Sequence, residues 1–522
     1  MNKNMIIFVN YMNRLLLALL SGLFMAFSWP SIGIFPLIFI AFVPLLILEK
    51  ESKNAKQVFI YSFLSFFVFN IITTYWVYHA TFFGAIIAFI INAVLMSIVF
   101  LLFHKIKLLT SNRIGYFSFI VLWISMEYLH LNWDLSWPWL TLGNVFANVP
   151  LLVQWYEFTG FLGGSFFVIL MNLLIFRVYQ KNNAKKFLLL PILVFLISVF
   201  SSAYIYVNFK QENNNNLNVL IIQPNIDPYI DKFSKGYQEQ LTDFIALVKT
   251  NITKETQLLL APETALLEGF WEHKIESTYS VRSLRDLQNE FPNLNILIGA
   301  TTYKLFNDGE KKTITAREIR NQNVFYDAYN SAVFIPKDGD IQVYHKRKLV
   351  PGAEKMPFPN ILDPLAKLVV DLGGVSGSLG SENSLNSFLV DSSVISPLIC
   401  YESVYGEMGL GITNLLAVIT NDGWWKNTAG YKQHFQYARL RAIEQRKWVV
   451  RSANTGISGV INSRGDVLQQ SKWDEAICLV TKVNLNNIST FYSEFGDYIG
   501  RVATFISSML LIVVFVKVRL RH

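Results

Sequence analysis

The hydrophobic residues of this chain follow two different patterns, and the pattern changes near residue 210. Before that point they form long runs with almost no charged residues, each about the length of a helix that crosses a bilayer. One more run of this kind lies near the C-terminal end. The runs predict about eight membrane-spanning helices, at Leu15–Trp29, Ile32–Leu48, Val58–Tyr78, Thr81–Phe103, Ile114–Leu131, Phe158–Phe176, Phe187–Val207 and Ile499–Val516.

Between residues 216 and 487 the pattern is that of an α/β domain. Short apolar runs bounded by polar residues and Gly predict strands, at Leu217–Gln223, Asn295–Thr301, Asn330–Ile335, Val394–Ile399, Leu415–Asn421, Trp448–Ala453, Ser458–Asn462 and Cys478–Val483. Helical patterns lie at Tyr237–Val248 and Tyr431–Arg446. Residues 363–390 are rich in Gly and Ser and predict a loop outside the core. We therefore expect a membrane domain at 1–210, the α/β domain at 216–487 and a C-terminal membrane helix at 499–517.

Composition and charge agree with a membrane protein. The mean hydropathy is +0.35, which is too apolar for a water-soluble protein of 522 residues. Lys and Arg occupy alternate connections between the runs, for example at Lys50, Lys105 and Arg177, so the positive-inside rule places these connections and both termini in the cytoplasm. The α/β domain then faces outward. This topology explains the net charge of +8, and no aromatic and basic pattern of a nucleic-acid-binding protein is present.

Three predicted strands end on residues that can carry out acyl transfer. One apolar strand runs into Glu263, another into Lys346, and the strand Val394–Ile399 ends on Cys400. A carboxylate can take the proton of a thiol, the thiolate can attack a carbonyl carbon, and an ammonium group can stabilise the resulting oxyanion. The alternative for Cys400 is an inert core residue, because cysteine is among the most buried residue types. The strand end alone does not decide between these interpretations.

The chain order Glu, Lys, Cys and the residues around it resemble the nitrilase superfamily. Cys400 continues into Tyr401 and Glu402, and Lys346 lies in a Tyr-x-Lys-x-x-Leu pattern. The resemblance implies a four-layer αββα sandwich. It also implies that Glu263 is the general base, Lys346 the oxyanion-stabilising cation and Cys400 the acylated nucleophile.

Because membrane runs flank this domain, nearly the whole chain is similar to the apolipoprotein N-acyltransferase family. Further matching stretches lie at Gln223–Ile226, Leu349–Pro351, Asn421–Trp424, Gln433–Phe435, Ala438–Ala442 and Arg451–Gly456. The resemblance implies transfer of an acyl chain from a membrane phospholipid, through a cysteine thioester, to the α-amino group of the diacylglyceryl-cysteine of an apolipoprotein. It implies a bacterial inner membrane protein whose catalytic domain is periplasmic, and no cofactor.

The resemblance gives supporting or substrate-binding roles to Glu354, Tyr401, Glu402 and Phe233. The chain departs from the family at Ala261 and Phe233, which stand where Trp is usual, and at Ala353, which stands where Gly is usual. These departures leave the triad intact and bear on the preferred acyl chain or headgroup.

Several other residues have interpretations that do not depend on the triad. No metal-ligand spacing is present, and we interpret His434 as a structural hydrogen-bonding residue. We interpret Cys478 as an apolar core residue and expect no disulfide with Cys400. The loop Asn132–Pro150 contains several Trp residues and is predicted to lie at the headgroup level, either as an ordinary aromatic belt or at a lipid entry.

Two alternative functions belong to other classes. A membrane-anchored amidase of the nitrilase type would hydrolyse a carbon–nitrogen bond, but a single anchor would suffice for it. An inactive lipid-binding or transport protein would not need an intact set of Glu263, Lys346 and Cys400. Both features favour the acyltransferase.

Overall fold

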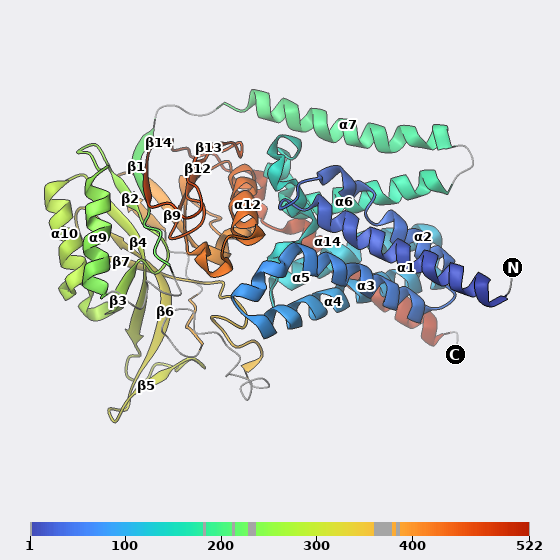
Figure 1. The fold of residues 1–522 in the computed structure, drawn as a ribbon, viewed down its shortest axis with the longest axis horizontal. Coiled ribbons are helices and arrows are strands. Elements are labelled where there is room, and N and C mark those ends of the chain that lie inside the picture. Colours follow the sequence, from blue (N-terminus) through green and yellow to red (C-terminus); the bar gives the residue numbers. More distant parts are fainter. Residues whose placement is uncertain are drawn as a thin grey trace. The chain divides into compact units, whose positions relative to one another are not determined.

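The structure is a computed structural model that describes residues 3–180, 184–210, 215–227, 236–359, 378–382 and 387–520. The chain divides into two compact units (Figure 1). One unit comprises Met1–Tyr78, Phe82–Phe209 and Phe495–His522, and is helical. The other comprises His79–Thr81 and Lys210–Glu494, and has the α/β fold.

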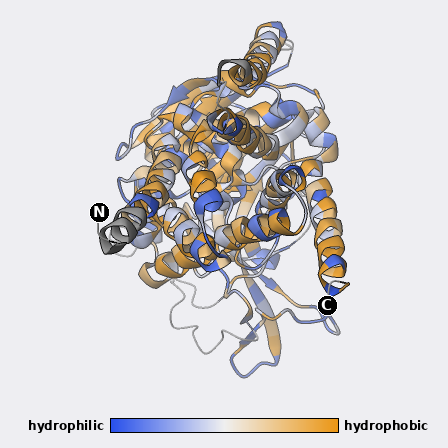
Figure 2. Cartoon of the chain, turned by 90° about the vertical axis from the view of Figure 1, so that its right-hand side faces the viewer, coloured by the Kyte–Doolittle hydropathy of each residue, from blue (hydrophilic) through white to orange (hydrophobic). Residues whose placement is uncertain are grey.

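The helical unit is built from long apolar helices, and hydrophobic residues cover most of them in Figure 2. They are α1 (Lys3–Ser28), α3 (Ala55–Thr74), α4 (Phe82–Leu109), α5 (Asn112–Leu131), α6 (Tyr156–Tyr179), α7 (Ala184–Asn208) and α14 (Tyr498–Arg519). Among the described residues, six helices have the length and composition to cross a membrane, and Met12–Ser28 of α1 forms a shorter apolar helix. Two of these helices have a side-chain N-cap. The Asn54 side chain accepts a hydrogen bond from the Gln57 amide at the start of α3, and the Ser111 side chain accepts one from the Ile114 amide at the start of α5.

The predicted span Ile32–Leu48 is not one helix, which corrects the sequence analysis. It consists of a 3₁₀ turn, η1 (Phe35–Phe39), followed by the short helix α2 (Val43–Glu51), and each begins with a proline at its first or second position. The buried side chain of Asn172 on α6 forms hydrogen bonds with backbone groups at the break between them. It accepts a hydrogen bond from the Phe42 amide at 2.8 Å and donates one to the Ile38 carbonyl at 2.7 Å.

The Trp-containing loop is folded into the helical unit more deeply than the sequence suggests. It forms three 3₁₀ turns, η3 (Pro138–Leu140), η4 (Leu142–Asn148) and η5 (Pro150–Leu152). Trp139 is buried and its ring packs edge-on against Trp76 at 4.8 Å, whereas Trp133 is exposed. Trp139 is thus a core residue of the helical unit, whereas the headgroup level of the loop stays a prediction.

The α/β unit contains two sheets. Within the described residues, the first has eight strands in the order β14-β1-β2-β4-β6-β5, with β3 paired to β4 and β7 to β6. Their bounds are β1 (Asn216–Gln223), β2 (Leu258–Leu260), β3 (Leu266–Trp271), β4 (Asn295–Leu305), β5 (Arg317–Ile319), β6 (Val324–Ile335), β7 (Gln342–His345) and β14 (Ile477–Asn484). The second has six strands in the order β13-β12-β11-β10-β9-β8. Their bounds are β8 (Phe388–Val390), β9 (Ser393–Ile399), β10 (Leu415–Thr420), β11 (Trp448–Ala453), β12 (Gly459–Ile461) and β13 (Val467–Gln470).

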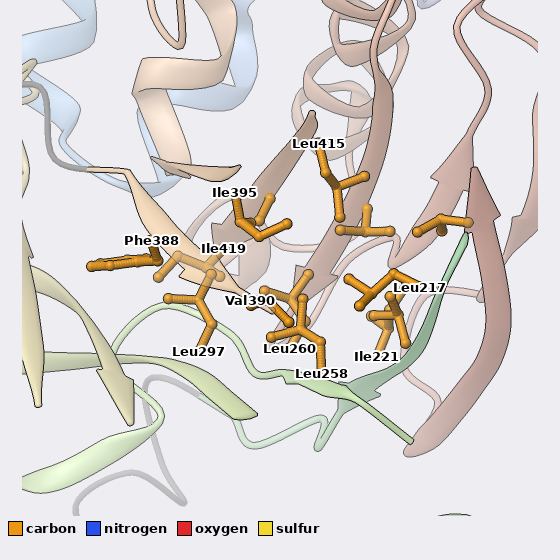
Figure 3. Close-up of a cluster of buried hydrophobic side chains, with 14 of the residues drawn as sticks. Leu217, Ile221, Leu258, Leu260, Leu297, Phe388, Val390, Ile395, Leu415 and Ile419 are labelled. Atoms are coloured by element: carbon orange, nitrogen blue, oxygen red, sulfur yellow. The ribbon is translucent and has the colours of Figure 1, made fainter. Parts of the chain in front are cut away.

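Apolar side chains of the two sheets face each other and form the central core of this unit. Figure 3 shows Leu217, Leu260 and Leu297 of the first sheet beside Ile395 and Leu415 of the second. A second core lies between the other face of the first sheet and helices α9 (Tyr237–Lys249) and α10 (Tyr279–Glu290). Helix α12 (Ala429–Gln445) packs on the second sheet. The predicted αββα sandwich is therefore confirmed.

One predicted loop needs a correction. Of residues 363–390, positions 363–377 and 383–386 lie outside the described residues. Residues 388–390, however, form strand β8, and the side chains of Phe388 and Val390 are buried in the central core. The end of the predicted loop is thus part of the core, because its alternating apolar residues pair with β9.

Candidate active site

Cys400 lies at the point where β9 ends and the 3₁₀ turn η8 (Cys400–Val404) begins. Its backbone is left-handed, with φ of 51°, a conformation that costs a residue other than Gly free energy and that recurs at functional turns. The thiol lies in the central core and is 8% exposed. Burial, and then the nearby Glu263 carboxylate, raise the pKa of this thiol well above its ordinary value, against the opposing charge of Lys346.

Lys346 follows β7 directly, and its ammonium group lies between two carboxylates. The Nζ–Oε1 distance is 2.8 Å to Glu354 and 3.1 Å to Glu263. Burial alone would lower the pKa of Lys346, but the charges of Glu263 and Glu354 outweigh it and raise the pKa well above its usual value. Lys346 is therefore a fixed cation, suited to stabilising negative charge rather than to exchanging protons.

Glu263 is placed by a tight backbone turn after β2. The next residue, Thr264, has a left-handed φ of 49°, and the Asn421 amide donates to Glu263 Oε2 at 3.0 Å. Gly299 on β4 passes so close that a Cβ there would lie 2.5 Å from the Glu263 Cα. Only a glycine at position 299 leaves room for this turn.

Asn330 on β6 is a site residue that the sequence analysis did not single out. Its Nδ2 donates to Glu263 Oε1 at 2.7 Å and to Glu354 Oε1 at 2.9 Å, so it holds both carboxylates on the ammonium of Lys346. The signal available in the sequence was a polar amide at the start of the predicted strand Asn330–Ile335, before its apolar residues 332–335.

Glu402 has a different kind of surroundings. Its two oxygens accept hydrogen bonds from the Tyr344 hydroxyl at 2.9 Å and from the backbone amides of Arg347 and Ile399 at 2.6 and 2.7 Å. Burial raises the pKa of this carboxyl above its ordinary value. Glu402 thus ties the end of β7 to the end of β9, which fixes Lys346 relative to Cys400.

The remaining predicted residues divide into three cases. Tyr401 is buried, and its ring contacts Tyr405 edge-on at 5.2 Å. Phe233 lies outside the described residues. Ala261 lies in the core beneath α9 and α10, whereas Cys400 lies in the core between the sheets. The departure at Ala261 therefore changes packing on the face away from the thiol.

The departure at Ala353 has a local explanation. The left-handed position of this turn, with φ of 78°, is occupied by Gly352, so that position 353 needs no glycine. Ala353 is buried, and its amide donates to the Val350 carbonyl at 3.2 Å. The turn still presents Glu354 to Lys346.

His434 on α12 contacts the backbone of the nucleophile turn. Its Nε2 lies 3.0 Å from the Cys400 carbonyl oxygen, which can only accept, and its Nδ1 lies 2.9 Å from Asp422 Oδ1. Burial lowers the pKa of His434, as does the neighbouring Arg451. The interpretation of His434 as a structural hydrogen-bonding residue is confirmed.

The two cysteines are free and differ in their surroundings. Cys478 Sγ lies 3.6 Å from the Leu247 carbonyl oxygen, and burial raises the pKa of this thiol to about 11. Among the residues that the structure describes, no group of three His, Cys, Asp or Glu could hold a metal ion. Cys400 and the described groups near it thus comprise a thiol, a carboxylate and a fixed cation, a set that can carry out acyl transfer through a thioester.

Comparisons with known proteins agree with this arrangement. Residues 21–174 match the apolipoprotein N-acyltransferase N-terminal domain, and residues 221–492 match the carbon-nitrogen hydrolase domain. The chain is 27% identical to the apolipoprotein N-acyltransferase of Chlorobaculum tepidum, over 96% of this chain and 97% of that protein. It is 28% identical to the protein of that name from Geobacter metallireducens, over 92% and 91%. The chain belongs to the carbon-nitrogen hydrolase family, as a member that also carries the N-terminal domain of apolipoprotein N-acyltransferases.

Proposed function

We propose that this protein is a phospholipid:apolipoprotein N-acyltransferase that works through an acyl-cysteine intermediate. It moves a fatty acyl chain from a membrane phospholipid to the α-amino group of the N-terminal S-diacylglyceryl-cysteine of an apolipoprotein. Glu263, Lys346 and Cys400 carry out the reaction in two half-reactions. The two observations that support the proposal are the Glu263–Lys346–Glu354 cluster beside Cys400 and relatives of this name that match the chain over nearly its whole length.

In the first half-reaction Glu263 takes the thiol proton and the Cys400 sulfur attacks the ester carbonyl carbon of the phospholipid. Lys346 stabilises the negative charge that develops on the carbonyl oxygen. The carbon–oxygen ester bond then breaks, and Glu263 returns its proton to the leaving alkoxide. The products are a lysophospholipid and an acyl thioester on Cys400.

In the second half-reaction the free amino group of the apolipoprotein attacks the thioester carbonyl. Glu263 takes a proton from the amine, the carbon–sulfur bond breaks, and the Cys400 thiol is regenerated. An ester is thereby exchanged for a more stable amide, and no energy-carrying cofactor is required.

The same proposal places the protein in a bacterial inner membrane, with a periplasmic catalytic domain and cytoplasmic termini. Basic residues in alternate connections support this orientation. A reporter that is active only outside the cytoplasm should be active when fused after Asn216 and inactive when fused after Lys53. The reverse pattern would contradict the orientation.

The acyl-transfer step is tested by following lysophospholipid release from the full-length enzyme. Without an acceptor we expect one burst of about one equivalent, because water is kept from the thioester. Adding a diacylated lipopeptide with a free N-terminus should restart release, and mass spectrometry should find the acyl adduct on Cys400. Continuous release without acceptor would instead indicate a hydrolase, and hydrolysis of simple amides would indicate an amidase.

A further inference from the structure

His345 lies next to Lys346 but faces a different set of residues. Successive side chains of a strand point to opposite faces, so the His345 ring turns away from Glu263. It lies between two other carboxylates: Nδ1 is 2.5 Å from Glu382 Oε2, and Nε2 is 2.7 Å from Glu272 Oε1. The His345 side chain is 3% exposed.

The His345 ring is held from three sides. Each ring nitrogen has a carboxylate oxygen as its hydrogen-bond partner. Burial would raise the pKa of Glu272, but the hydrogen-bonded His345 beside it holds that pKa below its ordinary value. The ring also stacks on Tyr329, with the ring centroids 3.8 Å apart and the ring planes at 13°.

The other charged groups around the ring come from β4, β5 and β6. Lys304 Nζ lies 3.5 Å from Glu382, and Arg317 donates to the Ser378 carbonyl at 3.1 Å. Asp327 accepts hydrogen bonds from two threonine hydroxyls. Burial raises the pKa of Tyr329, and the negative charges of Asp327, Glu382 and Glu272 raise it further. Segment 378–382 is thus also held by Lys304, through Glu382, and by Arg317, through the Ser378 carbonyl.

Glu382 belongs to a segment that is fastened to the proposed active site. In residues 378–382, the Leu379 amide donates to the Glu354 carbonyl at 2.8 Å, and the Gly380 amide to the Ala328 carbonyl at 2.8 Å. Gly380 packs closely against the Tyr329 ring, because a Cβ at position 380 would lie only 2.6 Å from Tyr329 Cε1. The His345–Glu382 contact therefore helps to hold the backbone of Glu354, whose side chain contacts Lys346.

We propose that His345 is a positioning residue: through Glu382 it holds segment 378–382 against Glu354, and so keeps Glu354 and Lys346 in the arrangement needed for acyl transfer. The kinetic part of this inference rests on the proposed function. Loss of the His345–Glu382 contact should therefore slow acyl transfer without weakening the binding of substrate.

The test compares the single-turnover rate of lysophospholipid release by the full-length enzyme with the rates of its variants. The variants are His345→Gln and Glu382→Gln. The control is Glu290→Gln, which removes an exposed pair with Lys249 elsewhere in the α/β unit. We expect both variants to release lysophospholipid about 10-fold more slowly than the control, with KM nearly unchanged.

A second measurement does not depend on activity. Hydrogen exchange of the Leu379 amide, corrected for the intrinsic effect of pH, should be faster in both variants than in the control. Variant rates that equal the control, or exchange at Leu379 that equals the control, would overturn the inference. If His345→Gln fails to fold, Glu382→Gln still decides, because the Glu382 side chain is 37% exposed and its loss is easily tolerated. A wild-type enzyme that releases no lysophospholipid would overturn the proposed function, whereas the exchange result would still test the positioning contact.

Discussion

The two units of the chain both bury polar side chains, but those side chains have different partners. In the helical unit, Asn172 bonds to the backbone on both sides of a broken segment. Glu127 accepts from the Leu142 amide and the Trp123 indole, at the start of the folded loop. In the α/β unit, the carboxylates of Glu263 and Glu354 share the ammonium of Lys346.

The difference teaches how to separate structural from reactive groups in this protein. A buried side chain whose partners are backbone amides and carbonyls satisfies groups that would otherwise be costly to bury. Ion pairing alone does not mark a reactive group, since the helical unit buries Glu49 with His104 and Lys107. The α/β unit likewise buries Asp422 with His434 and Arg451. The set of Glu263, Lys346 and Glu354 differs because it lies beside the Cys400 thiol, where a reacting substrate can use its charges. Glu402 shows that location alone does not mark a reactive group either. It lies close to the triad, yet it bonds to backbone amides and a hydroxyl, as the polar residues of the helical unit do.

The largest difference between the two kinds of buried residue should appear when the proposed nucleophile, Cys400, is removed. Cys400→Ser should abolish the lysophospholipid burst, with a loss of at least about 1,000-fold, because a hydroxyl is a far weaker nucleophile than a thiol. Cys478→Ser is the matched control and should keep the burst, since Cys478 lies in the core beneath α9 and α10. A burst that survives in the Cys400 variant would place the reaction on another residue.

The second prediction concerns Lys346, the cation that lies between the carboxylates of Glu263 and Glu354. Lys346→Arg should lower the burst rate by about 100-fold, because a planar guanidinium cannot occupy the position of a compact ammonium between Glu263 and Glu354. Lys348→Arg is the control, because its ammonium lies over the Tyr405 ring. Near-normal turnover in the Lys346 variant would mean that another cation stabilises the oxyanion.

The sequence predicted membrane helices and an α/β domain, because long apolar runs and short β-branched runs are set by local periodicity. The four layers of that domain followed only from the resemblance to the nitrilase superfamily. The sequence did not predict the break at Phe35–Glu51, since a run with two prolines is as apolar as an unbroken one and the side chains that make the break tolerable, such as Asn172, lie far away in sequence. It placed Glu263, Lys346 and Cys400 at strand ends. Asn330 and the contacts of His345 were missed, because they depend on which strands become neighbours in the sheet.

A smaller effect should come from loosening the link between the two strand ends. Tyr344→Phe removes the hydroxyl that donates to Glu402, while the backbone amides still hold that carboxylate. We expect a loss of roughly 10-fold or less in the burst rate, with KM unchanged. Tyr326→Phe is the control, since that ring lies among Trp271 and Tyr303 on a different part of β6. A loss as large as that of Lys346→Arg would mean that the Tyr344 hydroxyl takes part in the chemistry.

The last prediction concerns the helical unit, where the effect on the chemistry should be smallest. Asn172→Leu keeps the volume of the side chain approximately but leaves the Phe42 amide without its partner and removes one of the two donors to the Ile38 carbonyl. Each buried group left unsatisfied costs about 1–3 kcal/mol, so the thermal unfolding midpoint in detergent should fall clearly. Asn208→Leu is the control, because Asn208 is exposed and bonds only within its own helix. The burst per folded molecule should stay at the wild-type value in both variants. If Asn172→Leu left the midpoint unchanged, or removed the burst from protein that is still folded, then the buried amide of the helical unit would not be purely structural.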